Sequence, residues 1–161
     1  MTGVAALMRT TRREVSKKIG EFEDATLAGN ERIEEVIHLF HQEQKPELLM
    51  AVCLAIRERM MQDGHLIFPA DIEEDGEGNT LFSFKTLESN GMTALVAFTS
   101  QEEKRKGPES AAVSQFIDCM LEPLLQMEDI GGLVINPFGE AIFLDKEDIT
   151  VILNPGIERF M

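Results

Sequence analysis

The spacing of the apolar residues changes once along this chain, near position 64, and this change constrains the fold more than any other feature. Before it, apolar side chains recur every three or four residues, which is typical of amphipathic helices. The first such stretch runs from Asn30, a good N-cap residue, to about Gln44. The second runs from Pro46, which suits the first turn of a helix, to Gly64. Because only Lys45 separates the two, the sequence predicts a helical hairpin.

After position 64, apolar residues alternate with polar ones or form short runs, as in strands. Five strands are predicted, over residues 65–69, 81–87, 92–99, 132–136 and 140–144. The stretch 92–99 is apolar on both faces, which predicts a central strand. Turn signals such as Asn90-Gly91 join neighbouring strands into hairpins. We therefore expect an α+β domain with a largely antiparallel sheet of about five strands, on which the N-terminal helical hairpin and further helices pack.

Two further helices are predicted in the second half of the chain. The first would follow Ser110, with Pro123 kinking or restarting it. Its buried face would comprise Val113, Phe116, Ile117 and Met120. The last helix would begin at Asp145, with Asp148 completing a capping box.

The chain of 161 residues is long enough for one domain with a substantial core. We expect residues 30–161 to form this domain and residues 1–29 to form a helical N-terminal arm. Residues 1–20 carry five basic residues and one acidic residue, a net +4, so the rest of the chain carries −18 of the total of −14. Such an acidic body repels phosphate backbones, so nucleic acid is not expected as a partner. The basic arm could instead contact an acidic surface, including the protein's own.

Neither a membrane nor a secreted location is expected. No apolar stretch approaches the roughly 20 residues of a membrane-spanning helix, and the apolar opening "MTGVAALM" precedes its arginines, unlike in a secretory signal. Cys53 and Cys119 are too far apart for a CxxC motif and lie among apolar residues at helical spacing. We therefore expect a cytoplasmic protein whose two cysteines are reduced core thiols.

The stretch "GLVINPFGEAIFLDKEDITVIL", residues 132–153, resembles the C-terminal signature of the SseB N-terminal-domain family of bacterial proteins. Upstream, "LIFPAD", the acidic loop after it, "LFSF" and "ALVAFTS" look like that family's strand, loop, strand and Phe-Thr-Ser strand end. The resemblance covers roughly residues 30–155. It implies a strand, an Asn-Pro turn, a second strand and a closing helix. It implies no catalytic residue, because the family takes its name from an enhanced serine sensitivity phenotype and has no agreed activity. The secreted translocon protein of the same letters is unrelated.

One binding site is predicted, at the tip of the last hairpin. Asn136, Pro137 and Gly139 occupy preferred positions of a type I turn. If Phe138 is exposed there, Asn136, Pro137 and Phe138 form an apolar spot for a partner. The alternative is that Phe138 folds back over the edge of the sheet.

Two acidic patterns suggest metal sites, and each has a plainer interpretation. Glu34, His38 and His41 lie at i, i+4 and i+7 on a helix and could hold a divalent metal, or they could form a solvated helix face. The acidic loop 71–77 resembles a calcium loop, but the position that needs a bidentate glutamate is Phe82. A solvated loop is therefore expected there. No catalytic residue, metal or cofactor is predicted.

Three functions follow from these patterns. The preferred one is a non-enzymatic protein-interaction or regulatory module that binds a protein partner or self-associates, for instance as a homodimer. The second is a secretion-chaperone-like protein that holds client segments, by analogy of size and charge. The third is a metal-dependent enzyme that uses the Glu34, His38 and His41 face. Several methionines bear on whether the protein binds a partner, because they could form an adaptable binding surface or fill the core. They are Met50, Met60, Met61, Met120 and Met127.

Overall fold

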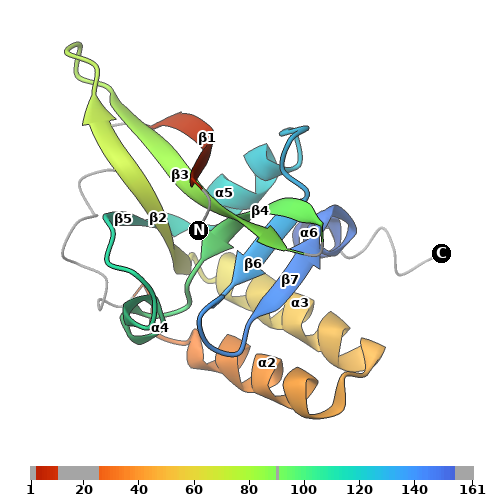
Figure 1. Ribbon diagram of the computed structural model, residues 1–161. Coiled ribbons are helices and arrows are strands. Elements are labelled where there is room, and N and C mark those ends of the chain that lie inside the picture. The colour runs from red at the N-terminus through yellow and green to blue at the C-terminus, as the bar shows by residue number, and fades with distance from the viewer. Residues whose placement is uncertain (1–2, 11–25, 90, 155–161) are drawn as a thin grey trace.

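The computed structural model describes residues 3–10, 26–89 and 91–154 (Figure 1). The strands are β1 (Gly3–Thr10), β2 (His65–Glu74), β3 (Thr80–Ser89), β4 (Met92–Ala97), β5 (Ala112–Phe116), β6 (Gly132–Ile135) and β7 (Ile142–Asp145). The helices are α2 (Glu31–Glu43), α3 (Pro46–Met61), α4 (Gln101–Arg105), α5 (Ile117–Leu124) and α6 (Lys146–Leu153). This arrangement confirms the predicted α+β class. The predicted helical hairpin is roughly matched by α2 and α3, which follow β1 rather than opening the fold, and among the described residues the sheet has seven strands rather than about five.

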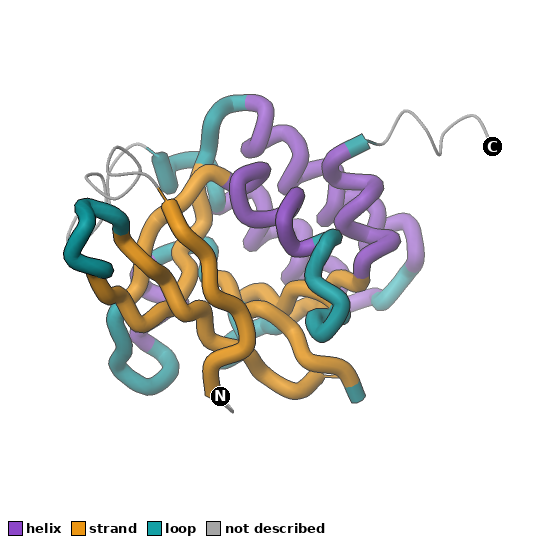
Figure 2. The backbone as a smooth tube through the Cα atoms, turned by 90° about the horizontal axis from the view of Figure 1, so that it is seen from above, coloured by secondary structure: helices purple, strands orange, loops and turns teal. Residues whose placement is uncertain are grey.

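The strands form one sheet in the order β5-β2-β3-β4-β6-β7, with β1 pairing with β3. Figure 2 shows the strands on one side of the molecule and most of the helical turns on the other. As predicted, β4 is a central strand, and both of its faces are buried. Leu95 and Ala97 join the main core beneath the helices, whereas Ala94 and Val96 join a second apolar cluster. Both faces of this part of the sheet are therefore covered.

The sheet is mixed, although antiparallel pairs dominate it. Among the described strands, five pairings are antiparallel and one, between β4 and β6, is parallel. In that pair Val96 lies opposite Val134 and Ala97 opposite Ile135. Parallel neighbours need a long crossover connection, and α4, β5 and α5 supply it here. The carboxyl ends of β4 and β6 therefore meet at the same edge of the sheet.

The helix predicted after Ser110 is wrong in its first half, because Ala112–Phe116 is strand β5. The strand pairs with the first half of β2, with Val113 opposite Phe68. It also carries Ser114, which is buried and hydrogen-bonded to His65 across the pair at 2.8 Å. Pairing with β2 therefore overrides the helical spacing of this stretch. The helix begins only at Ile117 and ends at Leu124, just after Pro123.

The prediction of a helical N-terminal arm is also wrong for the first residues of the chain. Gly3–Thr10 is strand β1, antiparallel to β3, with Leu7 opposite Ser83. The edge of β3 that β2 does not use offers backbone hydrogen-bonding groups, and an added strand satisfies them. Residues 11–25 of the predicted arm lie outside the described residues.

Candidate functional site

The predicted turn at the tip of the β6–β7 hairpin is present, but its side chains are not freely exposed. The N–H of Gly139 donates to the carbonyl of Asn136 at 3.0 Å, as the turn requires. Asn136 is only 3% exposed, and Pro137 and Phe138 are half-buried. Phe138 stacks on Phe98 with 6.2 Å between ring centroids. The alternative in which Phe138 folds back over the sheet therefore matches the structure, and the exposed apolar spot does not.

The segment after α4 covers this turn. A Cβ atom on Gly107 would lie 2.2 Å from the Phe138 ring, so the glycine lets the backbone approach the ring closely. A Cβ atom on Gly139 would lie 2.5 Å from Glu103 Oε1, and the Glu103 carboxylate pairs with Lys106 at 2.8 Å. The hydrogen bond that Lys106 donates to Glu103 raises the pKa of Lys106. Two chain segments about 30 residues apart are thus packed together at the hairpin tip.

Asn136 has a structural partner in Thr99, which follows β4 as Asn136 follows β6. The Asn136 amide oxygen accepts from the Thr99 backbone N–H at 3.0 Å, and its amide nitrogen donates to Thr99 Oγ1 at 3.0 Å. Thr99 is fully buried. These bonds join the "FTS" strand end and the "NPFG" turn, because both follow the carboxyl ends of the parallel pair.

The residues proposed as a metal-binding row each have a different neighbour. Glu34 accepts a hydrogen bond from Thr99 Oγ1. His38 pairs with Glu140 at 2.8 Å, and His41 Nε2 lies 2.6 Å from the carbonyl of Ala141. Within the described ranges, no three His, Cys, Asp or Glu side chains are grouped so as to hold a metal ion. Glu34, His38 and His41 instead connect α2 to the β6–β7 hairpin and to the end of β4.

The acidic stretch resembling a calcium loop is divided between a strand and a tight turn. The part up to Glu74 extends β2, where Asp71 pairs with Lys85 of β3 at 3.3 Å. In the turn, Asp75 Oδ1 accepts from the backbone N–H groups of Glu77 and Asn79 at 2.8 and 3.2 Å. The predicted solvated loop is therefore wrong up to Glu74, which belongs to β2, and holds only for the turn that follows.

A second buried polar group, not predicted from the sequence, lies between α2, α3 and the sheet. Asn30 occupies the predicted N-cap position of α2, but its side chain makes no capping hydrogen bond. Its amide nitrogen donates to the carbonyls of His65 and Thr99, both at 2.9 Å, and its amide oxygen accepts from Arg59 Nε at 2.9 Å. Arg59 is only 8% exposed. The sequence holds a signal for the burial of Arg59, because this residue follows the buried Val52 by seven positions and so lies on the apolar side of the helix.

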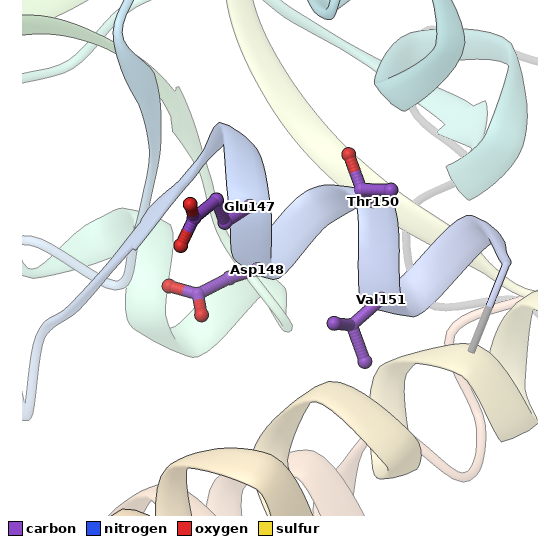
Figure 3. Close-up of a pocket in the computed structure, with 4 residues that line it drawn as sticks. All are labelled: Glu147, Asp148, Thr150 and Val151. Carbon is purple, nitrogen blue, oxygen red and sulfur yellow. The ribbon is translucent and has the colours of Figure 1, made fainter. Parts of the chain in front are cut away.

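A pocket of about 430 Å³ lies beside α6, lined by Glu147, Asp148, Thr150 and Val151 (Figure 3). The carboxylates of Glu147 and Asp148 point to the same side of the helix. Burial, with the charges of Asp145 and Glu147 adding to it, raises the pKa of Asp148 to about 6. Asp145 and Asp148 form the predicted capping box, with hydrogen bonds of 2.9 and 3.1 Å. Of the two acidic residues that line this pocket, Asp148 thus has a structural task at the start of α6.

The two cysteines differ in their surroundings. Cys53 is buried, as predicted, and burial together with the charges of Asp148 and Asp145 raises the pKa of its thiol to about 12. Such a thiol stays protonated at neutral pH and is a poor nucleophile. Cys119 is exposed, so its predicted place in the core is wrong. It lies on α5 between Asp118, also exposed, and the buried Met120.

The outer face of α3 is the most conspicuous apolar surface of the described residues. Met50, Leu54 and Met61 are 44%, 46% and 66% exposed. They lie at i, i+4 and i+11, on one side of the helix. Met120 lies in the core, and Met60 and Met127 pack against it, so the methionines are divided between the two predicted roles. The sequence signal for this outer face is that Met50 and Leu54 fall outside the periodic stripe that packs inward.

Comparisons with family models, curated proteins and solved structures give no match to this chain. The resemblance to the SseB N-terminal-domain family therefore stays a prediction. Of the helices described, none combines the length and the apolar character that crossing a bilayer requires.

Proposed function

We propose that this protein is a non-enzymatic interaction module that self-associates through the outer face of α3. The observation that carries the proposal is the exposed row of Met50, Leu54 and Met61. Methionine side chains are flexible and polarisable, which suits them to contacts with a second protein surface. Isolated apolar residues at a surface are ordinary, but here three lie on one side of one helix, with Arg57 between Leu54 and Met61.

A second copy of this chain is the occupant that the charges favour. Glu47 and Glu58 are exposed beside the stripe, since each lies three or four residues from one of its members. Residues 1–20 carry a net +4, so a second copy offers positive charge to these carboxylates. The overall charge of −14 opposes association. We therefore expect a weak dimer, with a Kd on the order of 10 µM.

Sedimentation equilibrium of the full chain tests this proposal. The double variant Met50→Gln/Leu54→Gln keeps the helix but removes the apolar stripe, and we expect it to weaken the dimer about tenfold or more. Met92→Gln is the matched control, because Met92 is also 40% exposed but lies at the start of β4. A wild-type chain that is monomeric up to about 500 µM would refute the proposal. So would a double variant that associates as tightly as the control.

A further inference from the structure

A second pocket lies where the start of α2 meets the end of α3. It has a volume of about 290 Å³ and is lined by Gly29, Arg32, Glu58, Arg59 and Gln62. We propose that this pocket binds a small oxyanion, a phosphate or carboxylate group, between the guanidinium groups of Arg32 and Arg59. The pocket shares Glu58 with the border of the proposed self-association surface, but anion binding there does not require a dimer.

The first argument is the unbalanced charge of Arg59. Its side chain donates to Asn30 Oδ1 at 2.9 Å, to Gln62 Oε1 at 2.8 Å and to the carbonyl of Thr26 at 2.8 Å. These three acceptors are all neutral. Within the part of the chain that the structure describes, no aspartate or glutamate forms an ion pair with this side chain. Buried charges in proteins are normally paired, so a bound anion would supply the missing counter-charge.

The second argument is that the guanidinium is held in place before any ligand arrives. A Cβ atom on Gly29 would lie 3.2 Å from its atoms, and one on Gly64 would lie 2.6 Å from Nη2. Two backbone segments without side chains therefore pack against it. A guanidinium has five N–H donors, and the hydrogen bonds to Asn30, Gln62 and Thr26 use three of them. Its fork can therefore receive an oxyanion with little loss of side-chain freedom.

The third argument is the charge around the pocket. The Arg32 side chain is 63% exposed and pairs with Glu35 at 3.5 Å. Because such a surface ion pair contributes little free energy, the side chain can turn towards a ligand at small cost. Both Gly29 and Arg32 lie at the amino end of α2, a helix of 13 residues, where the peptide dipoles favour negative charge. Glu58 opposes binding, and Glu31 already accepts from the N–H of Gly29 at 2.9 Å. The ligand should therefore be small and its affinity modest.

An NMR titration of the ¹⁵N-labelled full chain tests the proposal, with inorganic phosphate and acetate as probes and sodium chloride at equal ionic strength as the reference. We expect the Gly29 amide and the Arg59 Nε–H signals to shift saturably with at least one oxyanion and not with chloride. Tighter binding of phosphate would identify a phosphate site, and tighter binding of acetate a carboxylate site. Shifts that are absent, or that chloride reproduces, would overturn the proposal.

Two exposed variants change the affinity in opposite directions without touching the buried Arg59. Arg32→Gln should weaken binding by about threefold to tenfold, and Glu58→Gln should strengthen it by a similar factor. Lys45→Gln and Glu47→Gln are the matched controls, because they change the net charge equally at the other end of α2. That end is roughly 20 Å away, beyond the screening length of about 8 Å. If each variant bound phosphate and acetate as its control does, the pocket would not be the site.

Discussion

Asn136 should contribute to stability through its two hydrogen bonds to Thr99, and Asn136→Gly isolates that contribution. Asn136 has a φ of +54°, a conformation that glycine adopts without strain. The variant leaves the fully buried Thr99 N–H without its acceptor, which costs about 1–3 kcal/mol. It also removes the bond to Thr99 Oγ1, worth about 1 kcal/mol. We therefore expect the free energy of unfolding to fall by about 3 kcal/mol.

Urea unfolding followed by far-UV circular dichroism measures this change, because the chain has neither Trp nor Tyr for fluorescence. Asn136→Ala should cost about 1 kcal/mol more than Asn136→Gly, since alanine is strained at positive φ. Asn79→Gly is the control, because Asn79 makes its hydrogen bonds to Asp75 in a partly exposed turn and should lose less than about 1 kcal/mol.

A double-mutant cycle tests whether the loss comes from Thr99 itself. Thr99→Val keeps the shape of the side chain but removes the hydroxyl that Asn136 and Glu34 share. Combined with Asn136→Gly, it should cost about 1 kcal/mol less than the sum of the single changes. The reasoning fails if Asn136→Gly unfolds within about 0.5 kcal/mol of the wild type.

Three further substitutions test other contacts by the same unfolding measurement. The raised pKa of Asp148 means that the folded state binds the proton of this carboxyl more tightly than the unfolded state does. As the pH rises from 3.8 to about 6, the stability of the wild type should therefore fall relative to that of Asp148→Asn, by roughly 1 kcal/mol after allowance for partial exposure. A difference in stability that stays constant across this pH range would contradict the prediction. Gly132→Ala should cost about 3 kcal/mol or more, because its Cβ would lie 2.2 Å from the Leu144 carbonyl. Gly107→Ala should cost less, about 1–2 kcal/mol, because the Phe138 ring can move outward.

Features that depend on neighbouring residues could be predicted from the sequence. The α2–α3 hairpin follows from the apolar spacing and from Pro46, and its elements end within three residues of the predicted bounds. The turn at Asn136 follows from a backbone hydrogen bond, and the capping box of Asp145 from side-chain hydrogen bonds, each spanning three residues. In each case the chemistry that decides the structure lies within one turn of chain.

Features that depend on distant partners could not be predicted. The stretch Ala112–Phe116 has helical spacing, but the first half of β2 offers it an unpaired edge. Gly3–Thr10 lies against β3 for the same reason. The parallel β4–β6 pair joins segments about 35 residues apart, and no local pattern records that pairing. The exposure of Phe138 could not be predicted either, because it depends on packing against Gly107 and Phe98, which are distant in sequence.

Thr99 shows why the parallel pair matters for the whole molecule. Its carbonyl accepts from Asn30, its N–H donates to Asn136, and its hydroxyl donates to Glu34 while accepting from Asn136. These four bonds reach three places: the start of α2, the first turn of α2 and, through two bonds to Asn136, the end of β6. The same Asn30 then holds Arg59. An anion bound at Arg59 would therefore act on a side chain linked through Asn30 to the carbonyl of Thr99. Thr99→Val keeps this carbonyl, so phosphate should stabilise the variant and the wild type by the same amount. A smaller effect on the variant would show that the hydroxyl bonds to Glu34 and Asn136 are coupled to the anion as well.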